Sequence, residues 1–525
     1  MAAQHPLGYE ASLEGWSAAL WAALRAACPL PPGAAPDPPA GAPAPPPALR
    51  VHARALPGLR APAAPAEDQD DEAEVRACLA AAAALDAALA GGGGQGADDA
   101  AGEGGGEGDG APGRLRRFSA CSPFVARLLS NRLLTAEDSE REVRHLEFQL
   151  GAEGPQFQPG DALAVAPLAP LSCAAALLAR LALPDDAVLE LRVLGDPAGE
   201  EHAHEHAAPQ RAFTCAARHL VRGCLDVSSA PPRRTLFALL AATASQSHEA
   251  ARLAHFGSAA GREELGRYCA RERRCLLEVL ADFPSTQPPL GMLLQAGPRA
   301  HARLFSISSA AAAHPGCAHV TAAVVRWTTP LQRPRTGLLT GLLARAVPGR
   351  CAFGVWTLPG ALRLPGPGQA AAPLLLVGPG TGVAPFRAFA QQLQAAGAPH
   401  APVALFFGCR RAGVDELYRE EWAAASSEGG TLAPPGGYFA AYSRQGAAKR
   451  YVGHLLVEQG ARVWALLERG AHVFVAGAAG AMPRDVFDAL AQVVEQHAPG
   501  MASRAHAEAW LRGLEAQRRY TVECW

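Results

Sequence analysis

Apolar residues follow two different patterns along this chain, and the change between them falls near residue 373. Before that point, runs of alternating apolar and polar residues predict strands, and two longer stretches show the spacing of helices. The expected strands lie at 146–150, 161–167, 303–309 and 319–329, and the expected helices at 171–182 and within about 208–292. After residue 373, four apolar runs are each followed by a helical stretch, which is typical of a parallel, doubly wound sheet.

The first 28 residues predict one amphipathic helix, because apolar residues recur there at three- and four-residue steps. These residues are Leu13, Trp16, Leu20 and Leu24. A helix of this length is not stable alone and needs a partner surface. The segment has Glu10 and Glu14 but no basic region, which argues against a signal peptide.

Residues 29–115 have the composition of a linker. Ten of the 19 residues at 29–47 are Pro, and 11 of the 20 residues at 91–110 are Gly. Such segments bury too little apolar surface to offset the entropy lost on ordering. We therefore expect a largely disordered linker, interrupted by a short strand at 49–56 and an Ala-rich helix around 72–90.

Composition excludes several classes of protein. The chain has 525 residues, 49% of them hydrophobic and 18% charged, so it can bury a core. Its formal net charge of −2 argues against nucleic acid as a partner, and no apolar run of 18 residues predicts a membrane span. The 12 Cys include no CxxC pair, which predicts reduced thiols in the cytoplasm and no metal site. The His-rich stretch at 201–207 is expected to be a loop.

The sharpest local signal is LLLVGPGTGVAPFR, in which a buried strand leads into a helix through Gly378, Gly380 and Gly382. Glycines at such a turn let the backbone approach a diphosphate, and the free N–H groups at the helix start face its negative charge. The spacing differs from the standard GxGxxG of dinucleotide sites. An ordinary tight turn is the alternative.

A basic loop, SRQGAAKRY at 443–451, follows the third of the four late strands. Ser443, Arg444, Lys449 and Tyr451 place a hydroxyl, a guanidinium, an ammonium and a phenol within nine residues. An NAD site uses an acid near this point to bind the ribose 2′-hydroxyl, whereas a 2′-phosphate requires basic residues. No Asp or Glu lies in this loop, which favours a 2′-phosphate; a solvated basic loop is the alternative.

Two further segments offer candidate chemistry. In RLFSISS at 303–309, strand alternation places Arg303 and Phe305 on one face, which suits a ligand with an anion and a flat ring, and Ser306 follows as a hydroxyl donor. An amphipathic strand without a ligand is the alternative. The chain ends in RRYTVECW, where Trp525 is either a docking anchor or a movable cover over a planar cofactor. No Ser/His/Asp arrangement or carboxylate pair suggests hydrolysis.

The order of these motifs is more specific than any one of them. From about residue 116 to 525 the chain resembles the ferredoxin-reductase-like half of the diflavin reductases, which include the microsomal cytochrome reductase, nitric oxide synthase, methionine synthase reductase and a cytosolic NADPH-dependent branch. The motifs that carry the resemblance are RLFSISS, GLLT at 337–340, GPGTGVAPFR, FFGCRR at 406–411, SRQGAAKRY and the terminal Trp525.

The resemblance implies a multidomain, ferredoxin-reductase-like fold. An antiparallel β-barrel FAD domain at 116–370, with an α-helical connecting insert at about 208–292, would precede a doubly wound α/β NADP-binding domain at 371–525. Family members begin with a flavodoxin-like FMN domain of about 100–150 residues, and residues 1–28 resemble only its last loop and helix. We therefore expect no FMN binding by this chain alone. A truncated product and an FMN module supplied by another chain are both compatible with this.

The resemblance also implies a role for each matching residue. FAD would be held by Arg273, Arg303, Leu304, Phe305, Ser306, Gly337, Leu338, Leu339 and Thr340, with Trp525 over the flavin. NADPH would be held by Gly378, Gly380, Thr381, Gly382, Cys409, Arg410, Ser443, Arg444, Lys449, Arg450, Tyr451, Val452, Gly453 and Asp485. Ser306 near flavin N5, Glu523 near the nicotinamide and Trp525 as a gate would be the catalytic residues. Phe305 stands where the family usually has Tyr.

Within the group, the chain resembles the cytosolic branch that reduces anamorsin during iron–sulfur cluster assembly. Ala476 and Ala478 stand where the microsomal enzyme has Cys and Asp, and the cytosolic branch also lacks that Cys. This implies an anamorsin-type acceptor and a cytoplasmic location. Two other functions stay open: a non-catalytic interaction protein, and a one-flavin reductase or microsomal-type relative. The intact FAD and NADPH motifs favour an enzyme, whereas the missing FMN domain favours the other two.

Overall fold

The computed structural model describes residues 51–65, 70–89, 118–193, 211–366, 372–397, 400–501 and 503–525. The expected N-terminal helix, the Gly-rich stretch and the His-rich stretch lie outside these ranges. Internal contacts divide the chain into two compact units. We call them the helical unit, built mainly from residues 172–299 with β1 (Val51–Arg60), and the barrel–sheet unit, which contains most of the remainder.

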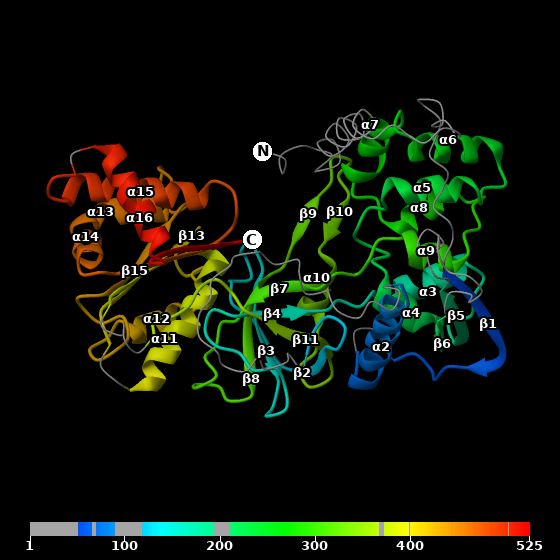
Figure 1. Ribbon diagram of the computed structural model, residues 1–525, viewed down its shortest axis with the longest axis horizontal. Coiled ribbons are helices and arrows are strands. Elements are labelled where there is room, and N and C mark those ends of the chain that lie inside the picture. Colours follow the sequence, from blue (N-terminus) through cyan, green and yellow to red (C-terminus); the bar gives the residue numbers. More distant parts are fainter. Residues whose placement is uncertain are drawn as a thin grey trace, which may run out of the picture. The chain divides into compact units, whose positions relative to one another are not determined.

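The helical unit combines a three-stranded antiparallel sheet with short helices (Figure 1). In the sheet, β5 (Ala187–Val193) lies between β1 and β6 (Arg211–Ala216). The helices are α3 (Leu171–Arg180), α4 (Ala217–Cys224), α5 (Arg234–Ala241), α6 (Ser247–Gly257), α7 (Arg262–Leu265), the π-helical turn η3 (Gly266–Ala270), α8 (Leu276–Asp282) and α9 (Leu290–Ala296). Phe237 and Phe256 meet edge to face in its core, with ring centroids 5.7 Å apart. The expected helical insert is therefore present, but it begins with strand β6.

Part of the expected linker is folded. The strand expected at 49–56 is β1, and it pairs with β5, starting at Val51 opposite Val193. The helix expected around 72–90 is α2 (Glu72–Leu89), whose Val75 and Cys78 pack against the β-barrel. Val51, Val75 and Cys78 are all fully buried. A few apolar residues within a Pro- and Gly-rich segment thus suffice to attach it to the folded units.

The β-barrel consists of six antiparallel strands. They are β2 (Phe124–Leu133), β3 (Val143–Gln149), β4 (Ala162–Val165), β7 (Arg303–Ser306), β8 (Cys317–Ala323) and β11 (Ala352–Leu358), in the spatial order β7-β4-β11-β2-β3-β8. A bridge between Ile307 and Val320 closes the barrel, and alternate residues such as Leu128 and Phe148 fill it. The run at 319–329, expected as one strand, lies in two: β8 and β9 (Arg326–Thr328), and β9 pairs with β10 (Pro334–Thr336).

The C-terminal part of the barrel–sheet unit is a five-stranded parallel sheet, here called the nucleotide sheet. Its strands are β12 (Leu374–Pro379), β13 (Val403–Cys409), β14 (Gly437–Tyr442), β15 (His472–Gly477) and β16 (Tyr520–Cys524), in the order β14-β13-β12-β15-β16. The sequence predicted the first four; the fifth, β16, is the segment expected as a C-terminal tail, and it pairs in parallel with β15.

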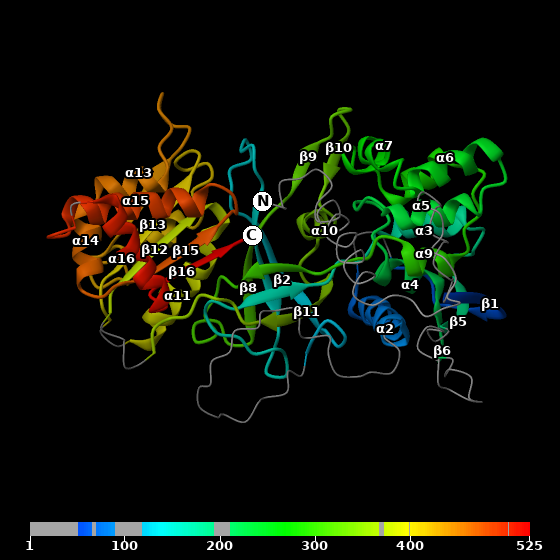
Figure 2. The ribbon, with the colours of Figure 1, turned by 45° about the horizontal axis from the view of Figure 1, so that its top comes forward.

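Helices cover both faces of the nucleotide sheet (Figure 2). Leu374 and Leu376 of β12 pack towards α11 (Ala384–Ala396) and α12 (Arg419–Ala425), while Leu375 and Val377 point to the opposite face. That face is covered by α13 (Val452–Glu458), α14 (Gly460–Glu468), α15 (Met482–His497) and α16 (Arg504–Ala516). The expected fold class, an antiparallel barrel followed by a doubly wound α/β domain, is confirmed. Within the described residues, every helix is too short or too polar to cross a membrane.

Candidate active site

The candidate site lies where the nucleotide-sheet strands end. β12 lies at the centre of the sheet, between β13 and β15. The chain leaves β12 towards β13 on one side and leaves β15 towards β16 on the other, so the loops after β12 and β15 lead away from each other. In open α/β sheets, ligands bind in the crevice that this switch of direction creates. The glycine-rich loop at 378–382 follows β12 directly and therefore lies at this crevice.

The geometry of the glycine-rich loop fits a diphosphate. A side chain at Gly382 would place its Cβ 2.0 Å from the carbonyl oxygen of Ala476, so only glycine allows this approach to β15. Gly380 has a φ of +59°, and the space on its open side holds no atom within 4 Å of an added Cβ. The loop then leads through a short 3-10 turn, which contains Thr381, into the N-terminus of α11, where free N–H groups favour an anion.

The ends of β13 and β14 bring together Arg410, which was predicted to bind NADPH, and Arg444, which was predicted to bind its 2′-phosphate. The Ser443 N–H donates to the carbonyl of Cys409 at 2.9 Å, and the Arg444 N–H donates to the carbonyl of Arg410 at 2.9 Å. Both guanidinium groups bind the carboxylate of Glu140, with the Arg410 Nη1 at 2.5 Å and the Arg444 Nη1 at 2.6 Å. An anion thus already occupies the place between the two arginines.

The remaining residues of this loop differ in environment. Lys449 is exposed, and no acidic group of the described residues lies within ion-pair distance of it. Arg450 instead pairs with Glu458 of α13. Tyr451, which is 51% exposed, precedes α13, and its N–H donates to the Nδ1 of His454 at 3.0 Å. Lys449 and Tyr451 are therefore accessible to a ligand.

Four other predicted NADPH residues differ in their exposure: Cys409, Val452, Gly453 and Asp485. Val452 is buried, and Gly453 lies against the backbone of Asp485, whose side chain is exposed in the first turn of α15. Burial, with the nearby Asp415 and Glu416, raises the pKa of the Cys409 thiol, so this thiol is uncharged at neutral pH. Their contact with NADPH stays a prediction.

The strand expected to bind FAD, β7, pairs with β4 on one side and leaves Arg303 and Leu304 exposed. The Arg303 Nη1 donates to the carbonyl of His301 at 2.8 Å. No carboxylate of the described residues lies within ion-pair distance of this guanidinium, so its charge is available to an anion. Phe305 is half-buried against the barrel core, with part of its ring accessible.

The segment at 337–340, expected as a diphosphate loop, forms the N-terminus of α10 (Leu338–Arg345). Gly337 is the N-cap residue and supplies no side-chain acceptor to the first N–H groups of the helix. Its own N–H donates to the Val325 carbonyl at 2.9 Å, and the Thr340 hydroxyl accepts from the Val325 N–H at 3.2 Å. The N–H groups of Leu338 and Leu339 thus remain for an anion such as a diphosphate.

Two predicted catalytic residues meet where the barrel and the nucleotide sheet adjoin. The Ser306 hydroxyl of β7 donates to Oε1 of Glu523 at 3.3 Å, and the Ala361 N–H donates to Oε2 at 3.0 Å. Parallel pairing sets Glu523 opposite Ala476 of β15. Trp525 is held by its backbone alone: its N–H donates to the Gly477 carbonyl at 3.2 Å, and its ring is 51% exposed.

Comparisons with known proteins agree with this geometry. A family model described as FAD binding domain matches residues 116–342, and one described as Oxidoreductase NAD-binding domain matches residues 376–487. A protein named NADPH-dependent diflavin oxidoreductase 1 from Arabidopsis thaliana is 38% identical over 420 residues, which cover 79% of this chain and 66% of that protein. Its namesake from Bos taurus is 37% identical, with 78% and 66% covered. The chain belongs to the diflavin reductase family.

The chain is also similar to a relative of lower sequence identity. NADPH--cytochrome P450 reductase from Homo sapiens is 32% identical over 435 residues, covering 79% of this chain and 61% of that protein. The chain spans about two thirds of the length of the diflavin oxidoreductases it matches. The two family models cover most of the barrel, the insert and most of the nucleotide sheet, and they leave residues 1–115, 343–375 and 488–525 unmatched.

Arg273, which the resemblance implies as an FAD-contacting residue, lies in the helical unit. It occupies the turn between η3 and α8, with a φ of +47° and an exposed side chain. A non-glycine residue in this left-handed region is uncommon and often marks a functional position. Its contact with FAD stays a prediction.

A buried polar junction between the nucleotide sheet and the barrel was not predicted from the sequence. Arg387 of α11 donates to the Ser308 carbonyl at 2.7 Å and to the Nδ1 of His319 at 3.3 Å, and it forms a bidentate pair with Glu421. The Tyr418 hydroxyl lies 3.0 Å from the Nδ1 of His145. The RLFSISS strand and the helix after the glycine loop are therefore joined through one arginine.

Within this junction, His145, Glu147 and His319 lie close enough together to hold a metal ion. Because Arg387 can only donate to the Nδ1 of His319, that ring carries its proton on Nε2, the atom facing Glu147. The His145 Nε2 lies 3.1 Å from Oε1 of Glu147, and the His319 Nε2 lies 3.9 Å from Oε2, so the carboxylate faces both rings. Burial, with the charge of Arg387, lowers the pKa of His145 to about 3.

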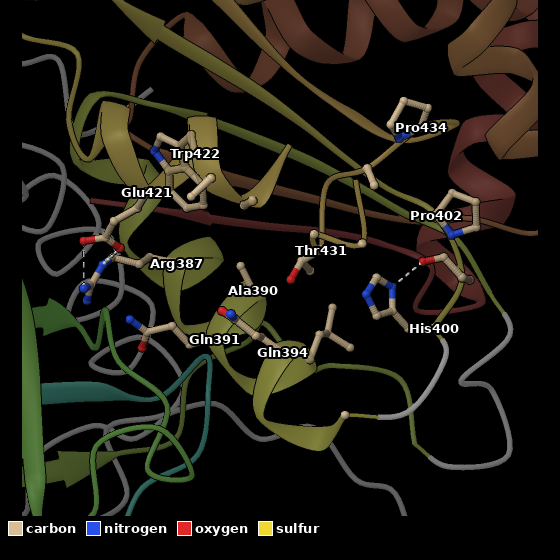
Figure 3. A pocket seen from close by; sticks show the side chains of 18 of the residues that line it. Arg387, Ala390, Gln391, Gln394, His400, Pro402, Glu421, Trp422, Thr431 and Pro434 are labelled. Carbon is tan, nitrogen blue, oxygen red and sulfur yellow. Dashed lines mark hydrogen bonds and ion pairs between the residues drawn. The ribbon is translucent and has the colours of Figure 1, made fainter. Parts of the chain in front are cut away.

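A pocket of about 660 Å³ lies away from the predicted coenzyme residues (Figure 3). It opens between α11 and α12, beside Pro402 and Pro434, which precede β13 and β14. It is thus near the amino ends of these strands, whereas the glycine loop and the two arginines follow the carboxyl ends. The Arg387–Glu421 pair lines one end of it (Figure 3).

Proposed function

We propose that this chain transfers hydride from NADPH to FAD and forms the FAD/NADPH half of a diflavin electron-transfer system. The observation that carries the proposal is the contact between Ser306 and Glu523, 3.3 Å apart. It joins the predicted flavin strand to the edge of the nucleotide sheet where the coenzyme is expected. FAD, when bound, supplies the hydride-accepting flavin ring, and the protein supplies orientation and charge.

The residues around the site fit both cofactors. Arg303 and the N-terminus of α10 would hold the FAD diphosphate, with Phe305 against the flavin ring. The glycine-rich loop at 378–382 would hold the NADPH diphosphate, and Arg410, Ser443, Arg444, Lys449 and Tyr451 the 2′-phosphate. Arg303, Arg444, Lys449 and Tyr451 are exposed, and a ligand can displace the Glu140 carboxylate from Arg410 and Arg444.

Glu523 carries the electrostatic part of the mechanism. Glu523 would stabilise the positive charge that a nicotinamide bound beside it gains on giving up hydride. Ser306 and the Ala361 N–H orient the carboxylate by donating to its two oxygens. Trp525 would cover the site until the nicotinamide displaces it. Because only its backbone is paired, this movement leaves β16 intact.

We further propose that the electrons continue through an FMN module to an iron–sulfur protein of the anamorsin type in the cytoplasm. The similarity to proteins named NADPH-dependent diflavin oxidoreductase 1, and Ala476 at the position where the microsomal enzyme has Cys, support this choice. A one-flavin reductase that passes electrons directly to its acceptor is the second candidate.

The proposal is tested by an anaerobic titration of the purified, FAD-reconstituted chain with NADPH, following the flavin absorption band. We expect the band to bleach, with FAD as the flavin released on denaturation. The Glu523→Gln variant should bind FAD and NADP⁺ normally but bleach more slowly, because it loses the charge beside the nicotinamide. A chain that holds no FAD, or holds FAD that NADPH does not reduce, would support a non-catalytic interaction protein instead.

A further inference from the structure

One acidic side chain lies where the proposed 2′-phosphate would bind. Glu140 belongs to the barrel loop between β2 and β3, yet its carboxylate contacts Arg410 at the end of β13 and Arg444 after β14. The Arg444 Nη1 lies 2.8 Å from Oε1 and 2.6 Å from Oε2, so it binds both oxygens. A carboxylate held between two guanidinium groups has the charge and the acceptors of a small phosphate.

The position of Glu140 is fixed by its loop. The Ala136 N–H donates to the Val414 carbonyl at 2.8 Å, which ties the loop to the segment after β13. The neighbouring acid, Glu142, faces away and pairs with Arg144 and Arg326. Glu140 is therefore the acid of this loop that is directed at the two arginines.

The acids of the nucleotide sheet do not compete for the same guanidinium groups. Asp415 accepts the backbone N–H groups of Arg410 and Arg411, at 3.0 and 2.7 Å, and so stabilises the loop rather than the side chains. Burial, together with the nearby charges of Arg141 and Arg444, lowers the pKa of Arg410. Arg141, Arg410 and Arg444 thus carry more positive charge than Glu140 neutralises, and this excess attracts an anion.

We propose that Glu140 is a coenzyme-specificity residue: its carboxylate occupies the 2′-phosphate position in the ligand-free chain and competes with NADPH but not with NADH. This rests on the proposed function, in which Arg410 and Arg444 bind the 2′-phosphate. A 2′-phosphate must displace the carboxylate or suffer repulsion from it. A ribose 2′-hydroxyl, in contrast, can donate to it, which is how acids bind the ribose in NAD sites.

The exposure of Glu140 determines how much its charge should weaken NADP⁺ binding. Its side chain is 58% exposed, so water and salt weaken its two ion pairs and a phosphate can displace it at modest cost. Removing the charge should therefore strengthen NADP⁺ binding by about three- to tenfold at low salt. Affinity for NAD⁺ should stay unchanged or fall.

The test compares Glu140→Gln with the unmodified FAD-loaded chain by isothermal titration calorimetry at low and at physiological salt. The probes are NADP⁺, NAD⁺, and the fragments 2′,5′-ADP and 5′-AMP. We expect tighter binding of NADP⁺ and 2′,5′-ADP, unchanged or weaker binding of NAD⁺ and 5′-AMP, and a smaller gain at higher salt. Glu137→Gln is the matched control, because Glu137 is exposed on the same loop and contacts neither arginine.

The outcomes separate this inference from the proposed function. Unchanged NADP⁺ affinity in Glu140→Gln, or an equal gain for NADP⁺ and NAD⁺, would overturn the role of Glu140. An equal gain in Glu137→Gln would also overturn it, because the effect would then be one of net charge. If Arg444→Ala weakens NADP⁺ and NAD⁺ equally, the 2′-phosphate assignment itself fails, whatever Glu140→Gln shows.

Discussion

Arg444 carries a charge that we expect to distinguish NADPH from NADH. Its side chain is 44% exposed and reaches beyond the end of β14. A hydrogen bond to a charged group contributes about 1.5–3 kcal/mol. Replacing Arg444 or Lys449 by Ala should therefore raise the KM for NADPH by about ten- to a hundredfold while leaving the KM for NADH nearly unchanged.

Steady-state kinetics with both coenzymes checks this prediction. Arg484→Ala is a suitable control, because Arg484 is 87% exposed on α15 and pairs only within its own helix, with Asp488. Equal losses with NADPH and NADH would show that the loop at 443–451 binds no 2′-phosphate.

A second prediction concerns the Trp525 side chain. Its exposed ring has no stacking partner among the described aromatic residues, so Trp525→Ala should change the free energy of unfolding by less than about 0.5 kcal/mol. Loss of a cover over the flavin should nevertheless raise turnover with NADH about three- to tenfold relative to NADPH. Val522→Ala, in the strand that precedes Trp525, is the control. Unchanged NADH turnover in the Trp525 variant would contradict a gating role.

Individual residues also show where the sequence is informative. Gly380 and Gly382 could be recognised because their role depends on the local turn from β12 into α11. Glu140 could not, since the acid that meets Arg444 lies 304 residues earlier, in another domain. A search for acids within 443–451 tests only neighbours along the chain. Such a search cannot detect a contact with a residue that is distant in the sequence.

The buried histidines at the junction of α11 with β3 and β8 make the fold sensitive to acid. Burial lowers the pKa of His145 to about 3 and that of His319 to about 2, with the charge of Arg387 contributing to both. In the unfolded chain, both rings titrate near their ordinary value of about 6.5. The unfolded state therefore binds more protons below that pH, and acid favours unfolding.

We accordingly expect the free energy of unfolding to fall as the pH decreases from about 6.5 towards 3, by about 1.4 kcal/mol per pH unit for each fully neutral histidine. Urea unfolding at pH 7.5, 6 and 5 measures this slope. His319→Gln should reduce it, whereas His506→Gln, at an exposed position in α16, should not. Equal slopes in all three proteins would show that the two rings are not held neutral.

The elements themselves were predictable to different degrees. The strands of the nucleotide sheet were recognisable because both of their faces are buried, which produces continuous apolar runs such as that of β12. β16 alternates Tyr520, Val522 and Cys524 with Thr521 and Glu523, which is the pattern of a strand, so its interpretation as a tail was wrong. β6 was not predicted as a strand because it leads directly into α4 without a turn signal.

For the whole molecule, the barrel and the nucleotide sheet belong to one compact unit. Arg387, Tyr418 and Glu523 each connect them. A ligand that binds the sheet should therefore also stabilise the barrel strands joined to it.

Hydrogen exchange with and without NADP⁺ tests this coupling. At 100 times the Kd, NADP⁺ stabilises the unit by about 2.7 kcal/mol, so exchange in β3 and β8 should slow by up to about 100-fold if these strands open together with the sheet. Strand β5, in the helical unit, is the internal comparison. Protection confined to β12 and α11 would show that the two parts unfold independently.

The attachment of residues 51–89 to both units affects where the chain can be divided. A fragment beginning at residue 116, where the FAD binding domain match starts, would lack β1 and α2. The outer edge of β5 would then present unpaired N–H and C=O groups, and the barrel residues Val125 and Leu168 would lose their cover. Open strand edges and apolar patches promote self-association. A soluble reductase fragment therefore needs to start before residue 51.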